Sequence, residues 1–346
     1  MIAPNDTPAF LAPALRDSRV ASGVANVLLI VNPASRSGKH ALPVVLGALR
    51  AAHVQSEVAE TTGPLHATTL VRDRLSADPG RFDAVLTLGG DGTAMEVASA
   101  LAAVHGAPPL GIIALGTANV LARTLGIPMQ APRAVAALLG ADRVAIDIGR
   151  VVGGPAFAIG LGVGLDASMI GGTSATLKQR IGYGAYALAA LRAGLRLERF
   201  RATITVDGVA HEVETSSVLV ANFGTVLGGL VCFGDGIGYA DGVLDVCIYS
   251  PQSYFGAMRI LVRMLLGGVR RDRHVRVISG RTVRIETDPP RPMQADGELL
   301  GMTPVDIRVE PNAVRVLIPR GTPRRWRLPR LTAARVRPEQ LECTAS

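Results

Sequence analysis

The stretch Ala84-Val-Leu-Thr-Leu-Gly89-Gly90-Asp91-Gly92-Thr93-Ala94 joins an apolar run, typical of a buried strand, to a glycine turn and a helical pattern. Such a turn exposes backbone N–H groups at the start of the helix, and its glycines let an anion approach the backbone closely. A carboxylate at Asp91 would repel that anion unless a cation such as Mg²⁺ bridges the two. Thr93 followed by Glu96 also predicts a capping box. The stretch therefore predicts a phosphate site at a strand end, with an ordinary strand-to-helix turn as the alternative.

Around this stretch, from Asn26 to about Ile148, apolar strand-like runs alternate with helical patterns. Strands are expected at Val27–Val31, Val54–Ala59, Ala84–Leu88, Leu110–Ala114 and Val144–Ile148. Helices are expected at Ala41–Ala52, Leu65–Leu75, Ala94–Val104, Ala118–Leu125 and Pro132–Leu139. Continuous apolar strands separated by helices predict an α/β fold with a doubly wound parallel sheet.

After about Gly149 the strand-like runs become shorter and are joined by tight turns. Asp207-Gly208 predicts a hairpin, and a second hairpin is expected where Asp306–Val309 and Ala313–Ile318 flank Glu310-Pro311-Asn312. Two helical patterns, Thr176–Leu197 and Tyr254–Leu266, interrupt this region. We therefore expect an α/β domain over residues 24–150, a β-rich domain over 151–319 and a basic tail over 320–346.

The amino-acid composition limits the classes of function that this chain can have. The chain has 346 residues, of which 48% are hydrophobic and 18% charged, as in globular proteins. Aromatic residues make up only 4%, which leaves few stacking platforms for single-stranded nucleic acid. No nucleic-acid-binding motif accompanies the basic residues, so we expect no nucleic-acid partner.

The net charge of +8 is concentrated in two places. From Arg320 onward there are seven arginines and two glutamates. A second cluster comprises Arg259, Arg263, Arg270, Arg271, Arg273 and Arg276. Such clusters favour anionic surfaces, so the sequence predicts peripheral contact with an anionic membrane.

Three cysteines, Cys232, Cys247 and Cys343, form no close pair, which fits a reducing cytosol better than a disulfide framework. No signal-peptide pattern is visible. The uncharged stretch Val97–Thr117 is long enough to span a bilayer, but its glycine and prolines divide it into a helix and a short strand. We expect a cytoplasmic protein that works at the inner face of the membrane.

Two further strand ends carry small polar residues. Asn32-Pro33 and Ser37-Gly38-Lys39 follow the first strand, and Thr117-Ala118-Asn119 follows the strand Leu110–Ala114. The carboxyl ends of parallel strands meet at one edge of a sheet, where ligands bind. Together with the Gly89–Thr93 turn, these loops predict one ligand site.

The order of these motifs resembles that of the diacylglycerol kinase-like lipid kinases, a superfamily that includes diacylglycerol, sphingosine and ceramide kinases and their bacterial relatives. The resemblance covers residues 26–318 and extends through Asp147-Ile-Gly149, Gly162-x-Gly164-x-Asp166-Ala167, Asp241-Gly242-x-Leu244-Asp245-Val246 and Asp296-Gly297-Glu298. It implies a nucleotide domain followed by a β-sandwich-like domain, with ATP in the cleft between them. It also implies Mg²⁺ and transfer of the γ-phosphoryl group to the hydroxyl of a lipid, either diacylglycerol or a sphingoid-like lipid.

The resemblance also implies which residues bind the nucleotide. Those near the phosphates would be Asn32, Pro33, Ser37, Gly38, Lys39, Gly89, Gly90, Asp91, Gly92, Thr93 and Glu96. Those lining the rest of the nucleotide would be Thr62, Thr117, Ala118 and Asn119.

Carboxylates would carry the chemistry. By resemblance, Asp296 would be the base for the lipid hydroxyl, with Glu298 serving nucleotide and metal. Asp91 and Asp147 would belong to the magnesium and water network. A structural magnesium would bind Asp241 and the carbonyls of Gly238 and Val243. Asp166 would contact the lipid head, or else only bond its own turn.

One position departs from the family pattern, because Val120 stands where many diacylglycerol kinases have aspartate. An NAD kinase is the first alternative, since such enzymes share the Gly-Gly-Asp-Gly turn, but their Asn-Glu dipeptide does not occur here. A non-catalytic nucleotide or lipid sensor is the second. The presence of Asp91, Asp147 and Asp296 disfavours it, since a degenerate kinase usually loses its carboxylates first.

Overall fold

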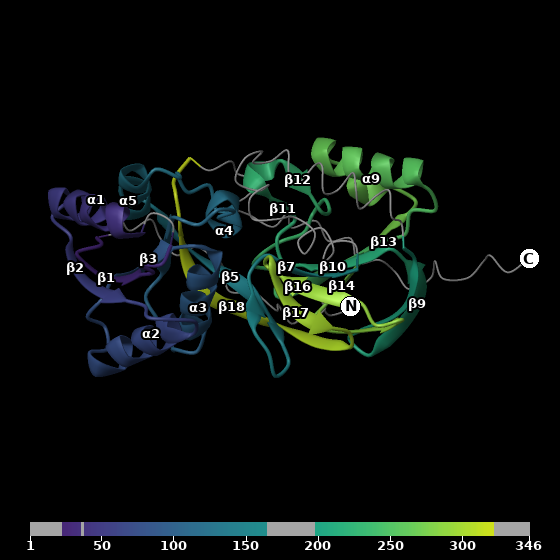
Figure 1. Cartoon of the computed structure of the whole chain (residues 1–346), viewed down its shortest axis with the longest axis horizontal. Helices are drawn as coiled ribbons and strands as arrows, with labels where there is room; N and C mark the ends of the chain where they lie inside the picture. Colours follow the sequence, from purple (N-terminus) through teal and green to yellow (C-terminus); the bar gives the residue numbers. More distant parts are fainter. Residues whose placement is uncertain (1–22, 36–37, 165–197, 322–346) are drawn as a thin grey trace, which may run out of the picture.

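The computed structural model describes residues 23–35, 38–164 and 198–321, and Figure 1 shows their arrangement. Ser37, Asp166, the expected helix Thr176–Leu197 and most of the basic tail lie outside the described residues.

A parallel sheet forms the centre of the first domain. Its strand order is β2 (Gln55–Glu60), β1 (Asn26–Val31), β3 (Ala84–Gly89) and β4 (Leu110–Ala114). Helices α1 (Gly38–Ala51) and α5 (Ala131–Leu139) pack together on one face, and α2 (His66–Ala77) and α3 (Asp91–Ala102) pack together on the other (Figure 1). The expected doubly wound sheet is thus confirmed for its first four strands, whereas the fifth expected strand, Val144–Ile148, is not part of the parallel order and instead pairs antiparallel with the strand at the end of the second domain. The order of the parallel sheet reverses between β1 and β3, and such a reversal is where α/β sheets bind ligands.

The stretch Val97–Thr117 contains the end of α3 and all of β4, as its glycine and prolines predict. In the part of the chain that the structure describes, no helix has the length and apolar character needed to cross a membrane.

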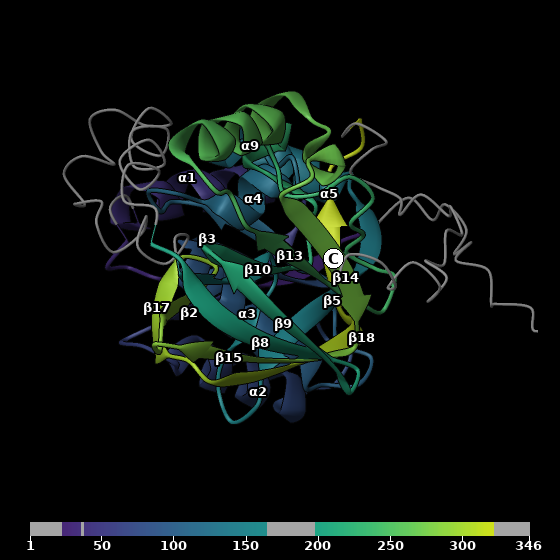
Figure 2. The same ribbon diagram turned by 90° about the vertical axis from the view of Figure 1, so that its right-hand side faces the viewer.

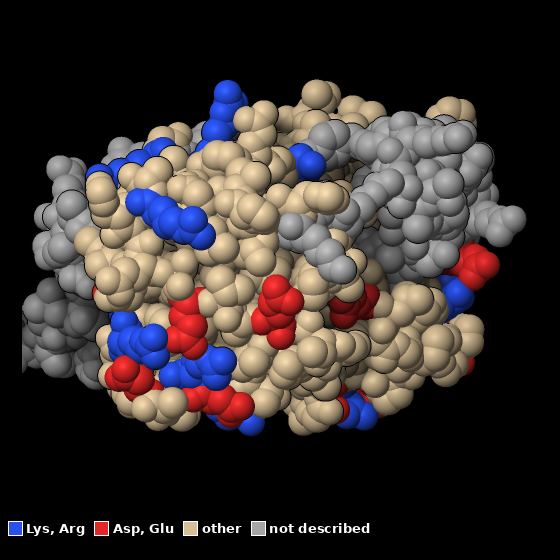
Figure 3. All heavy atoms as spheres, turned by 60° about the vertical axis from the view of Figure 1, so that its left-hand side comes forward, with Lys and Arg blue, Asp and Glu red and all other residues tan. Residues whose placement is uncertain are grey.

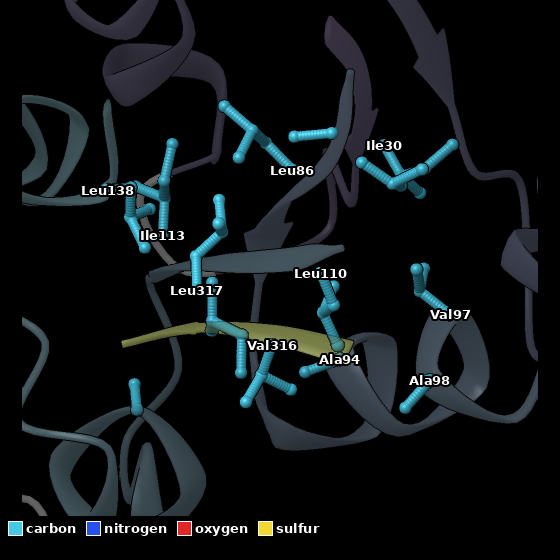
Figure 4. Close-up of a cluster of buried hydrophobic side chains, with 14 of the residues drawn as sticks. Ile30, Leu86, Ala94, Val97, Ala98, Leu110, Ile113, Leu138, Val316 and Leu317 are labelled. Carbon is cyan, nitrogen blue, oxygen red and sulfur yellow. The ribbon is translucent and has the colours of Figure 1, made fainter. Parts of the chain in front are cut away.

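The expected hairpin near the C-terminus is wrong, because residues 305–318 form one long strand, β18 (Val305–Ile318). It runs antiparallel to β5 (Asp142–Val151), with a register shift between Glu310 and Val314. Its last residues pair with β4 and are buried in the first domain, where Val316 and Leu317 lie among the side chains of Figure 4. Pro311-Asn312 thus makes a bulge rather than a reversal. The strand continues straight after the bulge, and its apolar residues are buried in the core of the first domain. The end of the expected second domain therefore packs with the first domain.

The second domain is a sandwich of two sheets (Figure 2). One is antiparallel, in the order β14 (Val275–Gly280), β13 (Leu244–Tyr249), β10 (Ser217–Ala221), β7 (Gly160–Gly164), β16 (Pro292–Ala295) and β17 (Glu298–Met302). The other contains β15 (Thr282–Asp288), β8 (Phe200–Val206), β9 (Val209–Thr215) and the first half of β18. Side chains such as Phe157, Leu161 and Ile285 fill the core between them. The predicted β-sandwich-like domain is thus confirmed.

Shorter elements complete the described fold. These are α4 (Val120–Thr124), β6 (Ala156–Phe157), β11 (Thr225–Val226), η1 (Leu227–Gly229), β12 (Val231–Cys232), α9 (Tyr254–Leu266) and η2 (Val269–Arg271). Helix α9 packs Ile260 against Leu219 and Cys247 on the outer face of the antiparallel sheet. Cys232 and Cys247 are both buried free thiols.

Candidate active-site cleft

A cleft of about 1900 Å³ lies between the two domains, at the carboxyl ends of β1 and β3. Nine of the predicted site residues line it. They are Asn32, Pro33, Thr62, Asp91, Gly92, Thr93 and Glu96 from the first domain and Asp296 and Glu298 from the second. The structure therefore brings the first glycine turn and the last predicted motif together, although about 200 residues separate them in the sequence.

The loop after β1 is bonded to the start of α3. The side-chain amide of Asn32 donates to Thr93 Oγ1 (3.2 Å), and its Oδ1 accepts the N–H of Ala34 (3.0 Å). The two neighbouring strand ends are thereby joined across the point where the sheet order reverses. Gly38 and Lys39 belong to the first turn of α1.

The predicted capping box is wrong. Helix α3 begins at Asp91, with extended Gly90 as its N-cap, so Thr93 lies inside the helix. Glu96 instead accepts the N–H of Ala67 through Oε2 (3.2 Å) and so ties α3 to α2. The earlier start places the carboxylate of Asp91 in the first turn, where the helix dipole stabilises negative charge.

Asp91 has a structural role that the sequence analysis missed. Its two oxygens accept the N–H groups of Val120 and Leu121 (3.1 Å each), at the first turn of α4. Burial raises the pKa of Asp91, while these bonds and Arg123 partly offset the rise. Asp91 therefore caps α4 and fixes the loop between β4 and α4.

The glycines at the two loops allow their close approach. A Cβ added at Gly116 would lie only 2.9 Å from Gly90 Cα, which is too close for two carbon atoms. Position 116 therefore has to be glycine for the two loops to lie this near to each other. Asn119 adopts a left-handed conformation (φ 48°), and its side-chain amide donates to the Gly116 carbonyl (2.7 Å). The Thr117–Asn119 loop thus lies beside the glycine turn, yet outside the lining of the cleft.

Thr62 enters the cleft from the loop after β2. Its N–H donates to His66 Nδ1 (3.0 Å), and its hydroxyl is 3.0 Å from the same nitrogen.

Asp296 occupies a two-residue turn between β16 and β17, with φ of 47° at Asp296 and 95° at Gly297. Its carboxylate accepts three backbone N–H groups, from Ala158 (2.7 Å), Ile159 (2.9 Å) and Gly160 (3.0 Å). Burial raises the pKa of Asp296 to about 6 in spite of these bonds, and the charge of Asp91 adds to the rise. Asp296 and Gly297 therefore form a hairpin turn that also places the Asp296 carboxylate in the cleft.

Asp147 is buried away from the cleft lining. Its oxygens accept the N–H groups of Asn312 and Gly242 (2.7 Å each), which hold the bulge of β18 and the loop before β13. The structure thus places Asp147 at the junction of the domains and does not bring it together with Asp91 and Asp296.

Asn222, which the sequence analysis did not single out, connects two of these sites. Its fully buried amide donates to the carbonyls of Asp147 and Ala158 (2.7 Å each). Ala158 in turn bonds Asp296. The available signal was a single asparagine directly after the apolar strand Ser217–Ala221.

Asp241 lies outside the cleft lining, near two other carboxylates. Its Oδ1 accepts the N–H of Val243 (3.3 Å). Burial raises its pKa to about 6, and the charges of Asp245 and Asp147 contribute to the rise. Clustered carboxylate charge favours a hard cation with oxygen ligands. Among the residues that the structure describes, no three His, Cys, Asp or Glu side chains are arranged to hold a metal, so such a cation would also need main-chain oxygens, as from Gly238 and Val243.

The chain matches two protein families in succession. Residues 26–151 match the family described as "Diacylglycerol kinase catalytic domain", and residues 160–318 match "YegS C-terminal NAD kinase beta sandwich-like domain".

Similar proteins agree with these matches. A "Probable lipid kinase YegS-like" of Pseudomonas aeruginosa (strain UCBPP-PA14) is 30% identical over 86% of this chain and 95% of its own length. The "Diacylglycerol kinase" of Bacillus subtilis is 30% identical over 69% of this chain and 80% of its own. An "Uncharacterized protein" of Synechocystis is 28% identical over 68% of this chain, which spans 54% of that relative. The crystal structure of a "putative diacylglycerol kinase" from Bacillus anthracis superposes with a TM-score of 0.73 at 25% identity, covering 89% of this chain and 99% of that one.

Proposed function

Because this chain belongs to the lipid kinase family that carries the diacylglycerol kinase catalytic domain, we propose that it transfers the γ-phosphoryl group of ATP to the hydroxyl of a membrane lipid. One observation carries this proposal. Asp296 of the second domain and the Gly89–Thr93 turn of the first face one cleft at the point where the strand order reverses. Phosphoryl transfer needs a cradle for phosphates and a positioned acceptor, and these two parts supply them.

The start of α3 is suited to hold the phosphates. Its free N–H groups and its dipole attract anions, and Gly92 places no side chain between the helix end and the cleft. Asn32 and Thr93, bonded to each other, add polar side chains at the same edge.

Asp296 is suited to be the base. A carboxylate offers about four lone-pair positions, and three N–H bonds occupy all but one of them. Those bonds hold the group in one orientation, and the remaining position can accept the proton of a lipid hydroxyl. A pKa of about 6 keeps the group ionised at neutral pH and close to the value at which a base is most effective.

Mg²⁺ would need oxygens beyond the acidic side chains at both places, because no three His, Cys, Asp or Glu side chains of the described residues are arranged to hold it. In the cleft, Asp91 and Glu298 would contribute carboxylate oxygens, the ligands that Mg²⁺ prefers, and the phosphates of ATP would supply the rest. When bound there with ATP, the cation would neutralise charge on the phosphates. Asp241, whose pKa is raised by burial and by its acidic neighbours, would hold a second, structural cation.

A panel experiment tests the function and its alternatives together. Purified protein would be incubated with labelled ATP, Mg²⁺ and, in separate reactions, diacylglycerol, sphingosine, ceramide and NAD, and the products separated. Label on one of the lipids, lost in Asp296→Asn, is the expected result. Label on NAD alone would identify a small-molecule kinase. ATP binding with no transfer to any acceptor would identify a nucleotide-binding relative.

A further inference from the structure

Helix α9 carries an apolar stripe on its solvent side. Phe255 and Leu266 are each 82% exposed, and Val262 is 43% exposed. Spaced at i, i+7 and i+11, the three lie on one face of the helix. The opposite face holds the buried Gly256 and Ile260. The helix is therefore anchored by one face and presents large apolar side chains on the other.

Basic side chains flank this stripe. Residues 254–276 contain six arginines and one acidic residue, Asp272. Two of the arginines, Arg259 and Arg263, pair with that aspartate (2.7 and 3.3 Å). Arg270, Arg271 and Arg273 follow the helix closely in the chain and are exposed, whereas Arg276 alternates with Val275 and Val277, which pack with α9, and so lies on the other face of β14. The positive charge beside the apolar stripe is thus mostly uncompensated within this segment.

The charge of this region differs from that of the opposite end of the molecule. On the side of the first domain, Asp and Glu side chains lie among the Lys and Arg (Figure 3). In Figures 1 and 2, α9 lies on the outside of the second domain, away from the parallel sheet. A helix with exposed apolar side chains and basic neighbours matches the pattern of helices that lie in a membrane interface.

We propose that α9 is the membrane-docking element of this protein, with Phe255, Val262 and Leu266 entering the boundary of the acyl chains and the neighbouring arginines contacting anionic lipid headgroups. A second copy is a poorer occupant, because a symmetric contact through this face would bring the two arginine clusters together. The proposal goes beyond the kinase assignment, since binding to a bilayer needs neither ATP nor an acceptor hydroxyl.

Vesicle binding without nucleotide tests the proposal. The full chain would be mixed with vesicles of phosphatidylcholine, with and without phosphatidylglycerol, and the bound fraction measured by flotation at low and high salt. We expect tighter binding to the anionic vesicles, weakened by salt. The double variant Phe255→Ser with Leu266→Ser should bind at least about tenfold more weakly, from the lost burial of two large side chains. Arg271→Gln with Arg273→Gln should lose about fivefold for each arginine that reaches the surface.

Matched controls come from the same chain. Val152 and Val209 are 61% and 59% exposed outside α9, so their serine variants should bind as the wild type does. Arg50→Gln with Arg133→Gln removes the same charge from the first domain and should also bind normally.

Three results would overturn the proposal. Unchanged vesicle binding of the α9 variants would place docking elsewhere. A wild-type dimer that the serine variant converts to a monomer would assign the stripe to a second copy. A marked fall in Tm of the serine variant would show that the chain itself covers the stripe. Failure of the lipid panel with intact vesicle binding would reject the kinase assignment alone.

Discussion

Two aspartates beside glycines reach the same cleft from opposite domains, and their surroundings differ. Asp91 lies in the first turn of α3 and accepts two N–H groups from α4. Asp296 lies in a hairpin turn and accepts three N–H groups from the start of β7 and the two residues before it. Burial raises the pKa of both. Each carboxylate is therefore part of the scaffold, and a reactive role must rest on the lone-pair positions that the backbone bonds leave free.

The two domains contribute different groups to the cleft. The first presents backbone donors at a helix start, where an anion can bind, and the second presents a fixed acceptor for a proton. Substitutions in the two turns should therefore affect different measurements.

The largest effect is expected from Asp296→Asn. Asparagine keeps Oδ1 for Ile159 and Gly160 but cannot accept the N–H of Ala158, which costs about 1–3 kcal/mol of stability. Loss of a general base should lower turnover about 10²–10⁴-fold, with little change in ATP affinity. Steady-state kinetics measures the turnover, and calorimetric titration measures the ATP affinity.

The chain contains a matched control for this change. Asp207 occupies another Asp-Gly hairpin with the same conformation, and its Oδ1 accepts the N–H groups of Arg281 and Thr282. Both bonds reach one oxygen, which asparagine keeps, so Asp207→Asn should change stability little and leave turnover unchanged. Turnover of Asp296→Asn within about threefold of wild type, too small for the loss of a base, would leave Asp296 with a turn role only.

The next effect is expected from Gly92→Val. A Cβ at Gly92 would meet Glu298 Oε1 at 2.9 Å, the far end of an exposed side chain that can move aside. The fold should survive, while a bulky group at the helix start would obstruct the phosphates and weaken ATP binding about 10–100-fold, as for lost hydrogen bonds to a charged ligand. Gly47→Val in α1, where a new Cβ meets nothing within 4 Å, is the control. Unchanged ATP affinity in Gly92→Val would remove the phosphate-loop assignment.

The two turns also differ in how far the sequence could predict them. The parallel sheet and the Gly89–Thr93 turn follow from local patterns of apolar residues and glycines, and the structure contains both. The capping of α4 by Asp91 joins residues about 30 positions apart, and no local pattern encodes it. The same holds for Asn222 and for β18, whose course depends on a core that the other domain supplies.

A smaller effect should follow Asp91→Asn. The amide keeps one acceptor for the first turn of α4 and loses the other, so stability should fall by about 1–2 kcal/mol, as for a lost helix cap. In the same domain, Asp83 also accepts two backbone N–H groups, from Ala25 (2.8 Å) and Asn26 (2.9 Å), away from the cleft. Both bonds reach the single oxygen Oδ2, which the amide oxygen of asparagine can replace, so Asp83→Asn should change neither Tm nor Mg²⁺-dependent ATP binding, whereas Asp91→Asn should lower Tm and weaken that binding. A wild-type Tm for Asp91→Asn would show that the cap contributes nothing.

The smallest effect concerns the pH dependence of stability and separates Asp296 from Asp241. Both have a pKa of about 6 in the folded protein, above the ordinary value of 3.8. The folded state therefore binds these protons more tightly than the unfolded state, and stability should rise as the pH falls from 7 through about 6 toward 4. The bond to Arg259 lowers the pKa of Asp272 to about 2, so protonation of this group reduces stability as the pH falls, but only below its ordinary value of 3.8.

Tm measured in EDTA should therefore increase between pH 7 and pH 5. Because Asp241 keeps contact with solvent, its share should be only about 1 kcal/mol. If Asp241 holds a cation, Mg²⁺ should raise Tm at pH 7 and flatten this dependence, because the bound charge replaces the proton. Asp241→Asn should abolish the effect of Mg²⁺ on Tm and leave the part of the pH dependence that belongs to Asp296. Asp296→Asn should keep the effect of Mg²⁺ and leave the part of the pH dependence that belongs to Asp241. An Asp241→Asn variant that Mg²⁺ still stabilises to the wild-type extent would move the cation to the cleft, beside Asp91 and Glu298.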